Sequence, residues 1–258
     1  MNAFINVIAN PSSISARRQL LLEWKAEGHP QARLLEVSLA LLEPDNLTRR
    51  EDELYFSLER RLPEKHGSEW AGRIGELASW YKYELGLISA CAVSGDTLVR
   101  HGDELFALAP ILSLGVSEPL RLTEILKMPQ LKQLKKFYVE SSEFNDAGAL
   151  QVAECANLAN VILGSIDCRG LTNIGLQALL NSPYFDNMVA CSLILPERLA
   201  NRPMPDGRQS IFYLNEQWFL YNDAATAKPW AAAVAEAQLG YTQHVFWPPL
   251  LDDLYWTE

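Results

Sequence analysis

The chain is poor in the residues from which metal and redox sites are usually built. It has four cysteines and four histidines in 258 residues. The cysteines have no C-x-x-C spacing and no neighbouring histidine cluster, which argues against a zinc site and favours reduced, packed thiols; they are Cys91, Cys155, Cys168 and Cys191. The histidines lie far apart, and each is interpreted as a solvated or turn-capping residue. We therefore expect no metal and no cofactor.

Long apolar runs and positive charge are also scarce. No segment reaches the roughly 18 uncharged apolar residues of a membrane span, and Met-Asn-Ala-Phe at the start is not a secretory signal, so we expect a cytoplasmic protein that does not bind membranes. The 22 Lys and Arg are outnumbered by 32 Asp and Glu, giving a net charge of -10. This charge disfavours nucleic-acid binding, which needs a basic footprint, and suits a basic protein partner.

Short catalytic motifs are absent as well. The sequence contains no Walker-type phosphate loop, G-x-G-x-x-G, H-E-x-x-H or G-x-S-x-G. We therefore expect a protein that is not an enzyme and has no catalytic residues. An alternative hypothesis places an enzyme site near the C-terminus, around His244 and Asp252.

The first 85 or so residues have the apolar spacing of four amphipathic helices. Ser13 marks a helix start and Gly28 a helix end. The second helix stops before Pro44 and the third before Pro63. The fourth is expected to contain Trp70, Ile74, Leu77 and Tyr81, with Trp80 beside the stripe. Its aromatic residues are interpreted as core rather than as a ligand cage, because their spacing is that of a buried stripe.

The most informative feature that is present is a repeat. The spacing L-x-x-L-x-L-x-x-N-x-L is fitted by Leu134, Phe137, Val139, Ser142 and Phe144, and again 27 residues later by Val161, Gly164, Ile166, Arg169 and Leu171. This repeat frame is typical of leucine-rich repeats, in which each unit supplies a strand and a helix. Leu112 and Leu114 are interpreted as the first inward pair, and residues 188–193 as the last strand.

Residues 197–258 do not continue this period. Ser210–Leu214 and Trp218–Tyr221 flank Asn215-Glu216-Gln217, which predicts a β-hairpin. An alanine-rich helix is expected over residues 230–238. Because an open stack would expose its terminal apolar face, this region is predicted to cap the stack.

The predicted fold class is therefore α/β, with three parts. Residues 1–84 form a helical module, residues 85–196 a short leucine-rich repeat stack of the ribonuclease-inhibitor-like kind, and residues 197–258 an α+β cap with a β-hairpin.

A family resemblance supports this division. Residues 4–11, the Trp-centred segment 20–30, Glu69-Trp70 and residues 100–110 resemble the bacterial repeat-companion domain found ahead of leucine-rich repeats. The resemblance covers roughly residues 4–195. It departs from the family at Ser142 and Arg169, where the repeat expects Asn. The resemblance implies a scaffold without catalytic residues.

The repeat frame also predicts a binding surface. If the first, fourth and sixth positions pack inward, alternate residues point outward from the sheet. This outward row is Ile111, Ser113, Gly115, Lys136, Tyr138, Glu140, Leu163, Ser165, Asp167, Ala190, Ser192 and Ile194. The residues expected to bind a partner are Lys136, Tyr138, Glu140, Ser165, Asp167 and Ser192. Tyr138 is the expected anchor, since tyrosine is enriched at interface centres.

The sequence therefore predicts a non-catalytic scaffold that binds a protein partner through this face and its flanks. A sharper alternative is an immunity-type inhibitor, whose acidic surface neutralises a basic toxin or effector.

Overall fold

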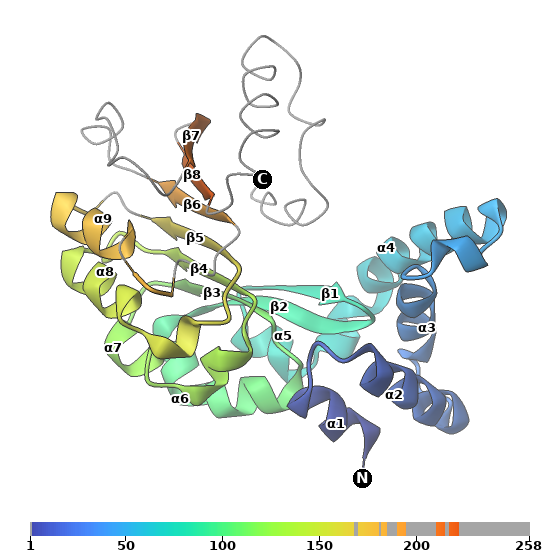
Figure 1. The fold of residues 1–258 in the computed structure, drawn as a ribbon. Helices are drawn as coiled ribbons and strands as arrows, with labels where there is room; N and C mark the ends of the chain where they lie inside the picture. Colours follow the sequence, from blue (N-terminus) through green and yellow to red (C-terminus); the bar gives the residue numbers. More distant parts are fainter. Residues whose placement is uncertain are drawn as a thin grey trace.

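The computed structural model describes residues 2–167, 170–180, 182–184, 190–194, 210–214 and 217–221. The fold is mixed α/β, as predicted: helices at the N-terminus precede a sheet with helices along its side (Figure 1). The sheet has eight strands in the order β1-β2-β3-β4-β5-β6-β8-β7.

The N-terminal helices begin and end largely where the sequence predicts. They are α1 (Ala3–Ala9), α2 (Ile14–Glu27), α3 (Ala32–Ala40), α4 (Arg49–Ala71) and α5 (Arg73–Leu77), with the short 3-10 helix η1 (Pro44–Asn46) before α4. The Ser13 side chain accepts a hydrogen bond from the Ala16 N–H and so caps α2. Gly28 ends α2 in the left-handed conformation, with φ 68°. Both predicted helix limits are therefore confirmed.

The predicted break at Pro63 was wrong. Helix α4 is 23 residues long and contains Pro63. Thr48 and Glu51 form a capping box at its start, in which each side chain bonds the other residue's backbone N–H. An interior proline removes one N–H from the helical ladder and usually kinks or ends a helix, but α4 continues through Pro63 to Ala71.

The prediction that a helix continues to Tyr81 was also wrong. Gly72 has a φ of 47° and separates α4 from the short α5. Residues Trp80–Glu84 then form strand β1, which pairs antiparallel with β2 (Leu87–Ser94). The tight turn between them places Leu85 and Gly86 at positive φ. The predicted boundary after residue 84 therefore falls inside a hairpin.

Strands β2 to β6 are parallel and in register. After β2 come β3 (Ser113–Ser117), β4 (Lys136–Glu140), β5 (Leu163–Asp167) and β6 (Ala190–Ile194). Lys136 pairs with Leu163 and Leu163 with Ala190, so these strands are spaced 27 residues apart. Helices follow β2, β3, β4 and β5 in turn, and they are α6 (Gly95–Leu108), α7 (Leu122–Ile125), α8 (Asp146–Ala153) and α9 (Asn173–Leu180). The 3-10 helices η2 (Pro129–Gln133) and η3 (Ala156–Leu158) lead into β4 and β5.

The inward positions of the frame form the core. Each side chain in this set is at most 5% exposed: Ile88, Cys91, Val93, Ile111, Leu114, Val116, Leu134, Phe137, Val139, Val161 and Ile166. They pack with apolar residues of α6, α7 and α8 in one cluster. Burial of this apolar row stabilises the fold by about 25 cal/mol per Å² of apolar surface removed from water.

The frame of the first unit was assigned incorrectly. Ser113 pairs with Lys136, which places Ile111 level with Leu134, and Ile111 is fully buried. The inward residues of this unit are therefore Ile111, Leu114 and Val116, and the outward ones are Ser113, Gly115 and Ser117. The unit is 23 residues long instead of 27, so alignment by its leucines alone shifts the frame.

Carboxylates of one unit accept hydrogen bonds from the next unit, at Ser142, where the repeat frame expects Asn, and at Thr172, three residues beyond the expected Asn position Arg169. Glu118 Oε1 accepts hydrogen bonds from the Ser142 N–H (2.6 Å) and the Ser142 hydroxyl. One unit later, Asp146 Oδ1 accepts from the Thr172 N–H (2.8 Å). A carboxylate of one unit therefore accepts hydrogen bonds from the loop of the next unit.

The predicted C-terminal hairpin is confirmed in its strands. Strands β7 (Ser210–Leu214) and β8 (Gln217–Tyr221) pair antiparallel, and β8 pairs antiparallel with β6. The hairpin therefore extends the sheet. The expected alanine-rich helix, His244 and Asp252 lie outside the described residues.

Two glycines at positive φ allow a test of how the hairpin turn packs on α3. A Cβ at Gly86 would lie 2.8 Å from Leu35 Cβ, whereas a Cβ at Gly28 would meet nothing within 4 Å. We expect Gly28→Ala to cost about 1 kcal/mol for its backbone strain alone. Gly86→Ala should cost about 3 kcal/mol, because the turn must also move away from α3. Urea unfolding measures both, and equal losses would contradict the close packing.

The hydrogen bonds from Ser142 to Glu118 predict that the stability of the fold decreases in acid. Hydrogen bonds from Ser142 lower the pKa of Glu118 below its usual 4.5. A lowered folded-state pKa stabilises the fold above the unfolded-state value, and this contribution is lost as the pH falls through the folded-state value. Glu118→Gln should therefore reduce stability at pH 7 and flatten its decline below pH 4.5. Urea midpoints from pH 7 to 2.5 test this, with exposed Glu154→Gln as control.

Candidate functional site

The strand register places the predicted partner-binding residues on neighbouring strands. Tyr138 pairs with Ser165, and Ser165 with Ser192. Lys136 and Glu140 lie two residues to either side of Tyr138 on β4, and Asp167 ends β5. Among the described helices, those that follow the strands, α6 to α9, lie along one side of the sheet (Figure 1). Tyr138 and Glu140 therefore belong to the face opposite the buried row, which we call the outer face.

The outer face is more open at the carboxyl ends of its strands. Glu140 is exposed there, and Tyr138 is half-buried. At the other end Ser113 is buried, and the Lys136 side chain is only 16% exposed, with Nζ 3.9 Å from Glu84 Oε1. Lys136 is thus part of an intramolecular charge cluster, and Glu140 is the better placed of the two for a partner.

Trp80 was missed as a residue of the outer face. It pairs with Ala92, Ala92 with Gly115, and Gly115 with Tyr138. Directly opposed residues of neighbouring strands share a face, so this cross-strand line runs along the outer face. Trp80 is 45% exposed. Its strand could have been recognised from the alternation of Tyr81, Lys82 and Tyr83, which helical spacing concealed.

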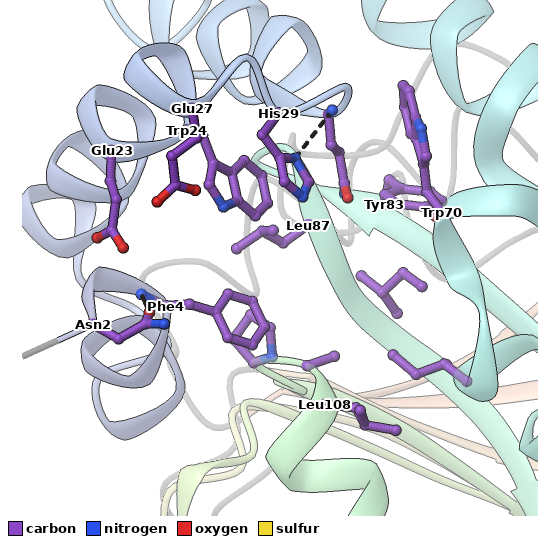
Figure 2. A pocket seen from close by; sticks show the side chains of 15 residues that line it. Asn2, Phe4, Glu23, Trp24, Glu27, His29, Trp70, Tyr83, Leu87 and Leu108 are labelled. Atoms are coloured by element: carbon purple, nitrogen blue, oxygen red, sulfur yellow. Dashed lines mark hydrogen bonds between the residues drawn. The ribbon is translucent and has the colours of Figure 1, made fainter.

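A second candidate site is a pocket beside the N-terminal helices (Figure 2). It has a volume of about 370 Å³ and lies between α1, α2, the end of α4, the β1–β2 hairpin and the end of α6. Five aromatic side chains line it: Phe4, Trp24, His29, Trp70 and Tyr83. Leu87 and Leu108 add apolar surface, and Glu23 and Glu27 lie on the side of Phe4 and Trp24.

One wall of the pocket is a stack of rings. The His29 ring lies 4.0 Å from the Trp24 ring at an interplanar angle of 10°, and Phe4 lies 6.5 Å from Trp24 on centroids. His29 Nδ1 accepts a hydrogen bond from the Gln31 N–H (3.2 Å). Burial lowers the pKa of His29 below its usual 6.5, which favours the neutral imidazole.

The opposite wall is the pair Trp70 and Tyr83. Their rings meet edge to face at 6.3 Å. Tyr83 Oη donates a hydrogen bond to the Gly67 carbonyl oxygen (2.9 Å), and burial raises the pKa of the phenol. The interpretation of the aromatics from Trp70 to Tyr81 as core holds only in part. Tyr81 packs against the core cluster, whereas Trp70 is only partly buried and lines the pocket, and Trp80 is 45% exposed.

Chemically reactive groups are not concentrated at either site. Cys91 and Cys155 are free thiols buried in the core. Burial raises the pKa of Cys91 to about 12 and also raises that of Cys155. Within the described residues, no group of three or more His, Cys, Asp or Glu is arranged to hold a metal ion.

Comparisons with protein-family models, curated proteins and solved structures found no match. In the described part of the chain, no helix has the length and apolar character to span a membrane. The outer face and the pocket are therefore the observations on which a functional proposal can rest.

The buried thiols should be unreactive in the folded protein. At pH 8 a thiol whose pKa is about 12 is almost entirely protonated, and only the thiolate attacks an alkylating reagent. We expect Cys91 to be alkylated by iodoacetamide at least about 100-fold more slowly in the native protein than in 6 M guanidinium. Peptide mass spectrometry measures each cysteine separately. Rapid native alkylation of Cys91 would contradict its burial.

Proposed function

We propose that this protein is a non-catalytic scaffold that binds a protein partner on the outer face of its sheet. The observation that carries the proposal is the cross-strand line from Trp80 through Ala92 and Gly115 to Tyr138. It places two large aromatic side chains on one face, with two small residues between them.

This arrangement suits protein recognition for a physical reason. Trp and Tyr contribute the most binding free energy at interfaces, because they bury a large area at low conformational cost. Ala92 and Gly115 leave room for a partner side chain to approach the backbone. The strands are held by the buried row beneath them, so little ordering entropy is lost on binding.

We also propose that strands β3 to β6 with their helices are leucine-rich repeat units. The 27-residue spacing of Lys136, Leu163 and Ala190 and the burial of the frame positions support this. In this proposal α1 to α5 correspond to the repeat-companion module that the sequence resembles. Strand β1 belongs to the sheet and provides Trp80.

Charge favours a second, narrower candidate function. The net charge is -10, and Glu140 is exposed on the outer face. An immunity-type inhibitor would use such a surface to cover the cationic site of a basic toxin or effector. The alternative enzyme site around His244 and Asp252 lies outside the described residues.

Paired alanine variants test the binding face. The double variant Trp80→Ala, Tyr138→Ala should capture at least about tenfold less partner protein from a lysate of the native host than the wild type does. Loss of two aromatic anchors should cost more than about 1.4 kcal/mol of binding free energy. Leu150→Ala is the matched control, because Leu150 is 42% exposed on α8. Quantitative mass spectrometry provides the comparison. Equal recovery by a double variant that folds normally would refute the proposal.

The inhibitor hypothesis makes a further prediction for the recovered partner. Its affinity should decrease steeply between 50 and 500 mM salt, because exposed charges are screened over a Debye length of about 4–14 Å in this range. Glu140→Lys should weaken binding, and Glu154→Lys should not. Binding that is independent of salt would favour an adaptor over an inhibitor.

A further inference from the structure

The aromatic pocket carries charge of one sign only. Among the fifteen described residues that line it, Glu23 and Glu27 are acidic and none is Lys or Arg. His29 does not repel a cation, because its Nδ1 accepts a hydrogen bond from the Gln31 N–H and therefore carries no proton. Trp24 covers one face of the His29 ring. The pocket therefore combines negative charge with the electron-rich faces of aromatic rings.

Glu27 is placed where its own helix disfavours it. It is the last residue of α2, and a carboxylate at a helix C-terminus faces the negative end of the helix dipole. Glu23 lies four residues earlier, and like charges at this spacing repel. Glu23 Oε2 accepts a hydrogen bond from the Ala3 N–H (2.9 Å), which accounts for Glu23 in the fold. Glu27 makes no hydrogen bond or ion pair within the described residues, and its charge acts on the His29 ring, whose pKa burial lowers more than Glu27 raises it.

A bound cation would remove this electrostatic conflict. Trp, Tyr and Phe rings attract an organic cation within about 6 Å, and the attraction grows as the cation loses water. The apolar residues Leu87 and Leu108 suit the hydrocarbon part of such a ligand. A volume of about 370 Å³ is at the small end of ligand pockets, which admits one compact group.

We propose that this pocket binds a monovalent organic cation, an alkylammonium or guanidinium group, beside the rings of Phe4 and Trp24, on the side of the pocket where Glu27 lies and supplies the counter-charge. The group is either the end of a basic side chain of a protein or a free small molecule. Both have the same chemistry: a diffuse positive charge on an apolar stem. The site is separate from the outer face and does not depend on its proposed function.

The test uses choline and its uncharged isostere, in which a carbon replaces the nitrogen. In proton NMR titrations of the full chain, the choline methyl signal should shift upfield, because the methyl groups lie over ring faces. Choline should bind at least about tenfold more tightly than the isostere if charge contributes. Measurable binding of both probes with equal affinity would overturn the proposal.

Two variants locate the site. Glu27→Gln keeps the shape of an exposed side chain and should weaken choline binding at least about fivefold. Glu53→Gln is the matched control, since Glu53 is an exposed acid of α4 outside the pocket, and it should have no effect. Phe4→Leu should reduce the upfield shift, because the Phe4 ring lies on the same side of the pocket as Glu27. If Glu27→Gln binds choline like the wild type, the assigned counter-charge is wrong.

Two further probes identify the source of the cation. Tighter binding of Nα-acetyl-argininamide or Nα-acetyl-lysinamide than of choline would assign the pocket to a protein side chain. The reverse order would assign it to a free small molecule, and failure of all three probes would overturn the proposal. Trp80→Ala should leave every one of these affinities unchanged, which separates this site from the outer face.

Discussion

The in-register pairing of β2 to β6 is the constraint on which the rest of the structure depends. Each inward residue of one strand lies beside the inward residue of the next, as Phe137 does beside Leu114 and Gly164. Side chains alternate between the two faces, so burial of this row against α6, α7 and α8 also decides which residues face outward. A slip by one residue would bury Tyr138 and Lys136 and expose Phe137.

A second contact joins the N-terminal helices to this sheet. The hairpin turn at Gly86 lies against Leu35 of α3, and Gln31 Nε2 donates a hydrogen bond to the Gly86 carbonyl oxygen (3.0 Å). Gln31 also donates its backbone N–H to His29, so the same residue orients a ring of the pocket. The pocket therefore exists because helices and hairpin meet at this turn.

Local signals in the sequence predicted local structure well. The caps Ser13 and Gly28 depend on neighbouring backbone groups, and the frame from Leu134 onward depends on a regular spacing, so both were readable without the fold. The errors occurred where local rules compete. Pro63 does not end α4, and the stripe from Trp70 to Tyr81 mixes a helix with the strand β1.

The sequence by itself determined the inward residues from Leu134 onward, because burial there follows a period that can be counted along the chain. It also determined the charge of the molecule and the strands of the C-terminal hairpin. Only the tertiary structure decided that Trp80 joins Tyr138 in one line, that Lys136 pairs with Glu84, and that Trp24 and Trp70 face one pocket. These pairs are far apart in sequence, and only the packing of the hairpin between helices and sheet brings them together.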